Sequence, residues 1–350
     1  MLTIGFAGTA KNTGKTTAAL ELVAQCRQAG WRIALTSIGY DGELRDNITG
    51  LPKPRYSLLP GEWVATTERG LRSGTAAMRV LDGTGVHTAL GEVLLAEILE
   101  PGLVVLAGPN RRADIQIILE RLEALGVTLT IVDGALNRLV PMICADGLVL
   151  STGAAFDERI PRLTEHARAL TGLFRYPVFR HLSSPATISL IYGDRPPVRL
   201  KHGSLLGEAS FYELLSALEL TPTAIVFPNA CDPGLVERLL ERCPRVRESH
   251  WVFGDPLKLI ASGSPLAWET LLDGLQVAYL DTLPLHCLTV NPFYPRYQPQ
   301  TGRYEAGWVD KAALLEAVEE EVTQTPVFDL RQPPTPDMLR LIGLSMEEAK

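Results

Sequence analysis

The first thirty residues hold the feature that most constrains the fold, a glycine- and threonine-rich loop between an expected strand and an expected helix. Residues 2–7 form a short apolar run typical of a buried strand, and residues 16–29 show the apolar spacing of a helix. The loop between them reads Gly8-Thr9-Ala10-Lys11-Asn12-Thr13-Gly14-Lys15-Thr16-Thr17. A Gly-Lys-Thr loop that follows a strand and precedes a helix has the context of a phosphate-binding loop.

The chemistry of such a loop is specific to phosphate groups. Its backbone N–H groups form a nest for an anion, and the helix N-terminus adds a partial positive charge. Gly14 lets the backbone approach the phosphates, Lys15 reaches the β- and γ-phosphates, and the Thr16 hydroxyl suits Mg²⁺. We therefore expect ATP with Mg²⁺ to bind here. The residues expected to form the binding site are Gly8, Thr9, Asn12, Thr13, Gly14, Lys15, Thr16 and Thr17.

Two carboxylates follow expected strands and are candidates for chemistry on the phosphates. Asp41 comes three residues after such a strand, at the edge of an α/β sheet where ligands bind. Asp133 ends the largely apolar run 127–133, in the manner of a Walker B strand. We expect Asp41 to share the metal with Thr16. Together with Lys15, both carboxylates are the expected catalytic residues, with a solvated loop for Asp41 and a turn cap for Asp133 as the structural alternatives.

Other expected strand ends carry residues suited to binding. Arg111 follows one such strand and suits a phosphate, and the small residues 151–154 would let a base or ribose approach the backbone. In the second half of the chain, residues 255–258 and the pair Asn291 and Pro292 are candidate contacts for a substrate or partner. For each of them, an ordinary turn or surface role is the alternative.

Expected strands and helices alternate along the chain, which predicts an α/β fold with right-handed βαβ connections. Expected strands of the first half lie at 2–7, 33–38, 77–81, 103–107, 127–132 and 147–150, and expected helices at 16–29, 86–99 and 115–125. Because most of these strands are apolar throughout, the sheet should be covered on both faces. We expect a P-loop NTPase fold with a mostly parallel, doubly wound sheet, followed by a second, smaller α/β domain.

The domain boundary is expected near residues 176–186. The predicted organisation is a nucleotide-binding domain at 1–180, a second α/β domain at 186–330 and a C-terminal tail at 331–350. Strands of the second half are expected at 186–192, 224–227, 250–253, 276–279, 288–290 and 326–329, and helices at 311–320 and from residue 235. The tail is expected to carry a short helix at 336–342 and to pack loosely.

Composition excludes several classes of function. The formal net charge is −7 and no basic stripe stands out, so nucleic acid is not an expected partner. Five cysteines without a C-x-x-C pair argue against a disulfide framework or a zinc site. No run of 18 apolar residues occurs, so no membrane span is expected, and the first residues lack the pattern of a secretion signal. We expect a cytoplasmic protein.

Several strings together resemble a known family. They are the loop with its flanks, the segments 37–43 and 46–54, the run 133–138, and Val290-Asn291-Pro292. This set is similar to the KamB-like P-loop subunit of lysine 5,6-aminomutase reactivases. The family lies in the dethiobiotin synthetase-like division of P-loop NTPases, whose loop has the same five-residue spacing between Gly8 and Gly14. The signature-lysine position of sandwich dimers is Ala10 here, which weakens the case for such a dimer and leaves a homodimer open.

The resemblance implies a function in protein repair. It implies an ATPase that helps restore an adenosylcobalamin-dependent aminomutase after cofactor damage, with a MutS-like reactivase subunit as a second partner. Two alternatives stay open. One is a small-molecule ligase or kinase of the dethiobiotin synthetase kind, and the other is a nucleotide-binding scaffold without hydrolysis.

Overall fold

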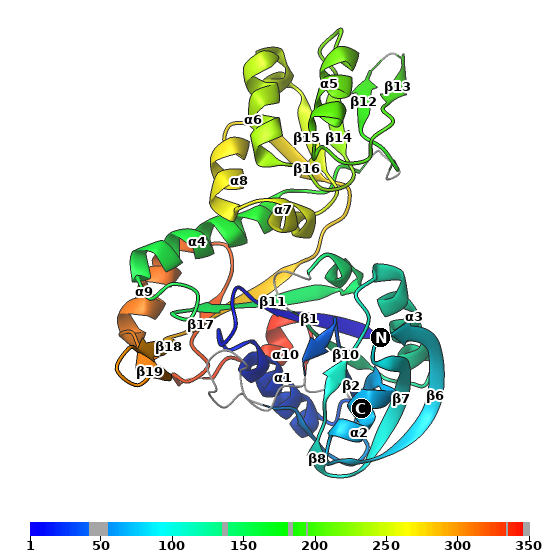
Figure 1. The fold of residues 1–350 in the computed structure, drawn as a ribbon, viewed down its shortest axis with the longest axis vertical. Helices are drawn as coiled ribbons and strands as arrows, with labels where there is room; N and C mark the ends of the chain where they lie inside the picture. The colour runs from blue at the N-terminus through cyan, green and yellow to red at the C-terminus, as the bar shows by residue number, and fades with distance from the viewer. Residues whose placement is uncertain (42–54, 135–138, 181–184, 194, 334, 346–350) are drawn as a thin grey trace. The chain divides into compact units, whose positions relative to one another are not determined.

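The chain folds into two α/β units, and the second is inserted within the sequence of the first. A computed structural model, drawn in Figure 1, describes residues 1–41, 55–134, 139–180, 185–193, 195–333 and 335–345. Unit 1 combines residues 1–164 with residues 284–350, and unit 2 covers residues 165–283. These limits differ from the expected boundaries at 180, 186 and 331, because the chain after Leu283 returns to the large sheet of unit 1. The second α/β unit is thus inserted into the first rather than following it.

Unit 1 is built on a nine-stranded sheet in the order β20-β17-β11-β1-β10-β2-β5-β7-β6. Pairs from β20 through β5 are parallel, while β5, β7 and β6 pair antiparallel. The α/β fold with a mostly parallel sheet is therefore confirmed. The strands are β1 (Leu2–Gly8), β2 (Ile33–Ser37), β5 (Trp63–Thr67), β6 (Ala77–Thr88), β7 (Gly91–Glu100), β10 (Leu129–Asp133), β11 (Gly147–Gly153), β17 (Leu285–Asn291) and β20 (Val327–Phe328).

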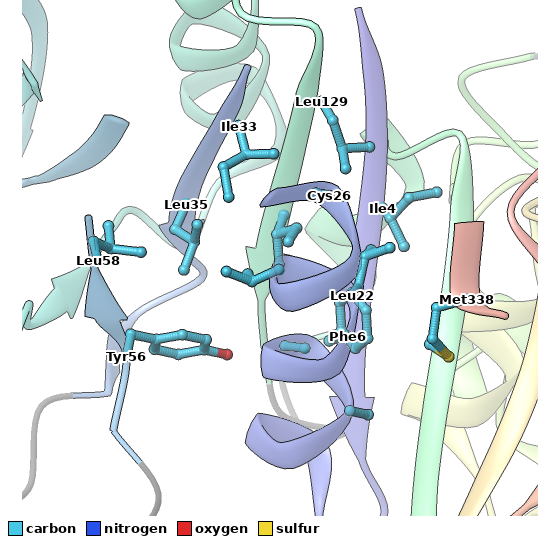
Figure 2. Close-up of a cluster of buried hydrophobic side chains, with 14 of the residues drawn as sticks. Ile4, Phe6, Leu22, Cys26, Ile33, Leu35, Tyr56, Leu58, Leu129 and Met338 are labelled. Carbon is cyan, nitrogen blue, oxygen red and sulfur yellow. The ribbon is translucent and has the colours of Figure 1, made fainter. Parts of the chain in front are cut away.

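Helices cover both faces of this sheet. On one face, Leu22 and Cys26 of α1 (Lys15–Ala29) pack in one buried cluster with Ile33 and other strand residues, as Figure 2 shows. On the other face, Ile118 of α3 (Arg112–Ala124) belongs to a cluster that contains Ala34. Successive residues of a strand point to opposite faces, so Ile33 and Ala34 place the two helices on opposite sides.

The part of the C-terminal tail that the structure describes packs in the core of unit 1, and not loosely as expected. The short helix α10 (Met338–Leu341) buries Met338 and Leu339 in the same cluster as α1, and Figure 2 shows Met338 beside that helix. The Gln25 side chain fixes the contact, because its Nε2 donates to the Pro336 carbonyl at 2.9 Å and its Oε1 accepts from the Met338 N–H at 2.7 Å. In the sequence, polar residues surround the few apolar residues of this segment, so the contact with α1 was not predicted.

Residues 86–99, expected to form a helix, form strands instead. They lie in the long antiparallel hairpin of β6 and β7 (Figure 1). Strand β7 also pairs with β5 on its other edge. Gly91 begins β7 with a φ of 101°, a conformation that residues with a side chain rarely adopt. Leucine, alanine and glutamate favour a helix here, but intrinsic propensity is weak. Strand β7 pairs on both edges, and its Val93 and Leu95 are buried in the cluster that contains Ile118 of α3.

The expected strand at 103–107 is also wrong. Its residues are divided between β8 (Gly102–Leu103) and β9 (Leu106–Ala107), which pair with β4 (Ser57–Leu58) and β3 (Tyr40–Asp41) outside the large sheet. Between the two short strands, the Val104 N–H donates to the Tyr56 carbonyl at 3.0 Å and the Val105 carbonyl accepts from the Thr66 hydroxyl at 2.8 Å. Residues 104 and 105 thus form hydrogen bonds with a loop carbonyl and a side-chain hydroxyl, in place of the regular backbone hydrogen bonds between strands.

Unit 2 has a five-stranded sheet in the order β13-β12-β14-β15-β16. The last three strands are parallel, whereas β12 pairs antiparallel with both of its neighbours. An aromatic core holds the sheet, with Phe227 stacked on Trp251 at 5.7 Å and on Phe253 at 5.5 Å between ring centroids. The elements are β12 (Ser189–Tyr192), β13 (Arg195–Arg199), β14 (Ala224–Phe227), β15 (His250–Phe253), β16 (Gln276–Tyr279), α5 (Glu208–Ala217), α6 (Pro233–Arg242), α7 (Pro256–Ser262) and α8 (Pro265–Leu272).

The described residues form several further elements. They are α2 (Glu68–Ser73), α4 (Ile160–Gly172), α9 (Lys311–Glu321), the hairpin of β18 (Phe293–Gln298) with β19 (Arg303–Trp308), and 3₁₀ helices at Val140–Cys144, Leu173–Arg175 and Pro244–Glu248. Among the residues described, none of the helices has the length and apolar character needed to cross a bilayer.

Candidate functional site

The parallel strands of unit 1 bring their carboxyl ends to one edge of the sheet. In the register of the sheet, Phe6 of β1 lies opposite Asp133 of β10, and Asp133 lies opposite Ser37 of β2. On the other side of β1, Gly8 lies opposite Ser151 of β11. Figure 1 shows β1 between β10 and β11, so the loop that leaves β1 emerges at the centre of this edge. Ligands bind at such edges in open α/β sheets.

The first half of the loop is fixed to β11. The Thr9 N–H donates to the Ser151 carbonyl at 2.9 Å, and the hydroxyls of Thr9 and Thr152 lie 2.9 Å apart in a hydrogen bond. Thr13 is buried and its hydroxyl donates to the Ala10 carbonyl at 2.9 Å. The loop therefore holds its shape with its own hydroxyl groups and those of the neighbouring strand.

Two residues of the loop have left-handed backbone conformations. Asn12 has a φ of 67°, and among the described residues it is the one non-glycine residue with a positive φ. Gly14, at the N-cap of α1, has a φ of 96°. Asparagine and glycine tolerate this region better than other residues, so both residue types fit the path of the chain. The turn they create leads directly into the helix.

The start of α1 provides the amide groups that an anion requires. Its first hydrogen bond runs from the Ala18 N–H to the Gly14 carbonyl at 3.0 Å. The amides of Lys15, Thr16 and Thr17 belong to the turn whose N–H groups a helix cannot bond internally. No acidic side chain lies in this first turn and Gly14 has no side chain to cap it. The helix N-terminus therefore matches a bound anion in both geometry and charge.

Lys15 and Asp133 meet at this edge of the sheet. The Lys15 Nζ lies 2.5 Å from the Asp133 Oδ1, and the two side chains are 15% and 1% exposed. Asp133 is the last residue of β10, and its carbonyl accepts from the Ile38 N–H at 2.8 Å. A buried carboxylate is costly without a partner cation. The lysine of the loop supplies that charge, so Lys15 and Asp133, two of the residues expected to be catalytic, are in direct contact.

The structure describes the expected metal ligands only in part. Thr16 lies in the first turn of α1 and is partly buried. The backbone of Asp41 ends β3 and pairs with Leu106, while its side chain lies outside the described part of the chain. The pairing of Thr16 with Asp41 around a metal thus stays a prediction.

Asn291 is a site residue whose role the sequence did not define. It ends β17, opposite Gly153 of β11, and its Nδ2 donates to the Asn12 carbonyl at 3.0 Å. A methyl group added to Gly14 would lie 3.5 Å from the Asn291 Cβ, so the asparagine packs directly against the loop. The available signal was an Asn-Pro pair at the end of an expected strand, which indicated a contact but not its target.

The remaining candidates take other positions. Arg111 is the N-cap residue of α3, with an exposed side chain. Asp255 lies in unit 2, where its Oδ1 accepts from the Lys258 N–H at 2.9 Å and its Oδ2 lies 3.0 Å from the Lys258 Nζ. Capping of α7 accounts for this carboxylate, so the pair at 255–258 has a structural role in the fold.

The buried thiols are unsuited to nucleophilic chemistry. Burial raises the pKa of Cys26 to about 12, with a further contribution from Glu62, and burial alone raises the pKa of Cys287 to about 12. Burial also raises the pKa of Cys231 far above its ordinary value. Since the thiolate is the reactive form, these three residues are packing groups.

The structure therefore gathers the loop from residues 8 to 17, Asp133 and Asn291 at one edge of the large sheet. Comparisons of the chain with protein-family models, curated proteins and solved structures found no match.

Proposed function

We propose that this chain binds ATP with Mg²⁺ at the loop of residues 8–17 and hydrolyses it under the control of a protein partner. The observation that carries the proposal is the contact between Lys15 and Asp133, at the start of a helix and at the carboxyl edge of a parallel sheet. A lysine, a helix N-terminus and a buried carboxylate at one point form the arrangement that recognises and transfers phosphoryl groups.

Lys15 and the first turn of α1 have distinct roles in this proposal. The amides at the start of α1 bind the phosphates through their N–H groups, and Lys15 neutralises the charge of the β- and γ-phosphates. Before nucleotide binds, Asp133 holds the ammonium of Lys15 within the site. An incoming triphosphate competes with this carboxylate for the same cation.

Thr16 and Asp41 are the residues proposed to hold Mg²⁺. The Thr16 hydroxyl is the ligand that the loop would provide, and Asp41 is the proposed acidic contribution. Among the described residues, no group of three or more His, Cys, Asp or Glu side chains is arranged to hold a metal. Magnesium needs no such group in this setting, because it keeps water ligands and binds the phosphates directly. When bound, it neutralises the charge that develops on the phosphates.

The biological role proposed for this ATPase is reactivation of an adenosylcobalamin-dependent aminomutase, together with a MutS-like subunit. It is supported by the resemblance of the loop, of residues 37–43 and of Val290-Asn291-Pro292 to the KamB-like reactivase subunit. In hydrolysis, water attacks the γ-phosphorus, the bond from that phosphorus to the bridging oxygen breaks, and ADP and phosphate leave. A ligase or kinase would use the same site with a metabolite in place of water.

Calorimetric titration of Mg–ATP into the purified chain tests the binding site. We expect Lys15→Ala to weaken binding by about a hundredfold, since a charge-assisted contact to phosphate contributes about 1.5–3 kcal/mol. Lys311→Ala is the matched control, because Lys311 is an exposed residue at the start of α9. Thr16→Val removes the hydroxyl without changing any charge, and it is a second test of the same site. Wild-type affinity in both Lys15→Ala and Thr16→Val would refute the proposed site.

Measurement of ADP release tests the partner-regulated role. The rate is measured for the chain alone and after addition of an aminomutase and a MutS-like protein from the same source. Stimulation by these proteins supports the reactivase role. A rate that rises only with a particular metabolite would favour the ligase or kinase, and tight binding without any ADP would favour the scaffold.

A further inference from the structure

We infer that Asn291 is a positioning residue that sets the backbone of the phosphate loop for the triphosphate. The inference rests on the proposed function, since it concerns the same site. Asn291 is separated from Asn12 by 279 positions in the chain, yet its side-chain amide donates to the Asn12 carbonyl at 3.0 Å. Tertiary structure thus provides the loop with an external support that is absent from the loop's own sequence.

The hydrogen bond acts on the residue with the least favourable backbone in the loop. Asn12 has a φ of 67°, a conformation that costs free energy for a residue with a side chain. The peptide bond that follows it is planar and trans, so its carbonyl and the N–H of Thr13 point in opposite directions. When Asn291 fixes the direction of the Asn12 carbonyl, it also fixes the direction of the Thr13 N–H. That amide is one of the donors expected to face the phosphates.

Asn291 itself is held firmly enough to act as a support. Its Oδ1 accepts from the Phe293 N–H at 3.2 Å, and its carbonyl accepts from the Ala154 N–H at 2.9 Å. A Cβ at Gly153, its partner in β11, would lie 2.1 Å from the Asn291 carbonyl oxygen, so the two backbones touch. Residues that support a site act best when their own positions are fixed by packing and hydrogen bonds.

The packing against Gly14 adds a second contact to the same loop. A Cβ built at Gly14 would have the Cβ and Nδ2 of Asn291 as its nearest neighbours, at 3.5 and 3.6 Å. The asparagine therefore lies against Gly14 on the side that the missing side chain leaves bare. The hydrogen bond to Asn12 and the packing against Gly14 are thus both contacts with the loop proposed to bind phosphate.

This geometry predicts which part of the ligand is affected. A residue that positions the loop affects the affinity for any triphosphate, with or without a nucleoside. A residue that contacts the base would affect the affinity for ATP alone. Inorganic tripolyphosphate, which has the phosphates but no base or ribose, separates the two roles.

The experiment compares Mg–ATP and Mg–tripolyphosphate binding by calorimetry in the full chain. The variants are Asn291→Ala and Asn291→Leu, and the latter removes the amide donor and acceptor while keeping a branched side chain of four heavy atoms. We expect both variants to bind each ligand about tenfold more weakly than the wild type, because each loses the hydrogen bond that orients the Asn12 carbonyl. The ligand-free thermal midpoint should fall only slightly, since each variant loses one hydrogen bond to the loop and one to the Phe293 N–H.

Asn229→Ala is the matched control. Its Nδ2 donates to the Gly203 carbonyl at 3.1 Å, also a bond from an asparagine to the backbone, but within unit 2. This variant should bind both ligands like the wild type. Unchanged tripolyphosphate affinity in a folded Asn291→Leu or Asn291→Ala protein overturns the inference, whatever happens to ATP. If the wild type itself binds neither ligand, the proposed function fails as well, so the two failures are distinguishable.

Discussion

Replacement of Lys15 by methionine should destabilise the ligand-free protein, because it removes the ammonium beside a buried carboxylate. Asp133 is 1% exposed and Lys15 is 15% exposed, with 2.5 Å between their charged atoms. Loss of one partner of a buried ion pair costs about 3–5 kcal/mol. Since Lys15 retains some exposure to solvent, we expect the lower end of that range, about 3 kcal/mol of unfolding free energy.

A double-mutant cycle measures the interaction itself. Asp133→Asn removes the negative charge at nearly constant size, so the double variant Lys15→Met with Asp133→Asn has no charge left to bury. We expect the loss in the double variant to be smaller than the sum of the two single losses by about 2 kcal/mol. Urea unfolding at pH 7 without nucleotide provides all four values.

An exposed ion pair of similar length is the control for this cycle. Arg121 and Asp82 approach to 2.7 Å, but their side chains are 46% and 42% exposed. Arg121→Met should therefore cost less than about 1 kcal/mol. Additive effects of Lys15→Met and Asp133→Asn would refute the reasoning, because they would mean that the buried charges do not stabilise each other.

Two further predictions concern stability. Met338→Ala should cost about 2–4 kcal/mol in urea unfolding, because Met338 is fully buried against α1, whereas Leu220→Ala at an exposed position should cost less than about 0.5 kcal/mol. Equal losses would mean that the end of the chain is not part of the core. Burial lowers the pKa of His166 from 6.5 to about 4 in the folded chain. Below pH 6.5 the unfolded chain binds a proton that the folded chain does not, so stability should fall by about 2 kcal/mol between pH 7 and pH 5. His166→Gln should remove most of this pH dependence, and an unchanged slope in that variant would contradict the assignment.

Elements that depend only on residues close together in the chain were predicted correctly from the sequence. The apolar run of β1, the Gly14-Lys15-Thr16 string and the helix that follows lie within thirty positions, and the strand, loop and helix formed as expected. The same holds for the strand that ends in Asp133. Local sterics and apolar periodicity decide these elements, and neither depends on distant parts of the chain.

The wrong predictions concern segments whose contacts with distant parts of the chain outweigh their local secondary-structure propensity. The stretch after Gly91 has helix-favouring residues, but β7 lies between β5 and β6, and pairing on both edges with burial of Val93 and Leu95 outweighs propensity. The last helix appeared peripheral because its partners, Gln25 and the buried face of α1, lie more than three hundred positions away. A strand at 103–107 was expected from apolar content alone, which cannot distinguish a sheet strand from a buried irregular segment.

In the candidate site, too, some features follow from local sequence and others from contacts between distant residues. The sequence by itself determined a loop with the amides, lysine and threonine suited to phosphate, because that chemistry resides in consecutive residues at a helix start. Only the tertiary structure decided that Lys15 contacts Asp133 and that Asn291 holds Asn12, because both contacts depend on the order of strands in the sheet. Strand order is set by the packing of the whole unit, and no spacing within the loop encodes it.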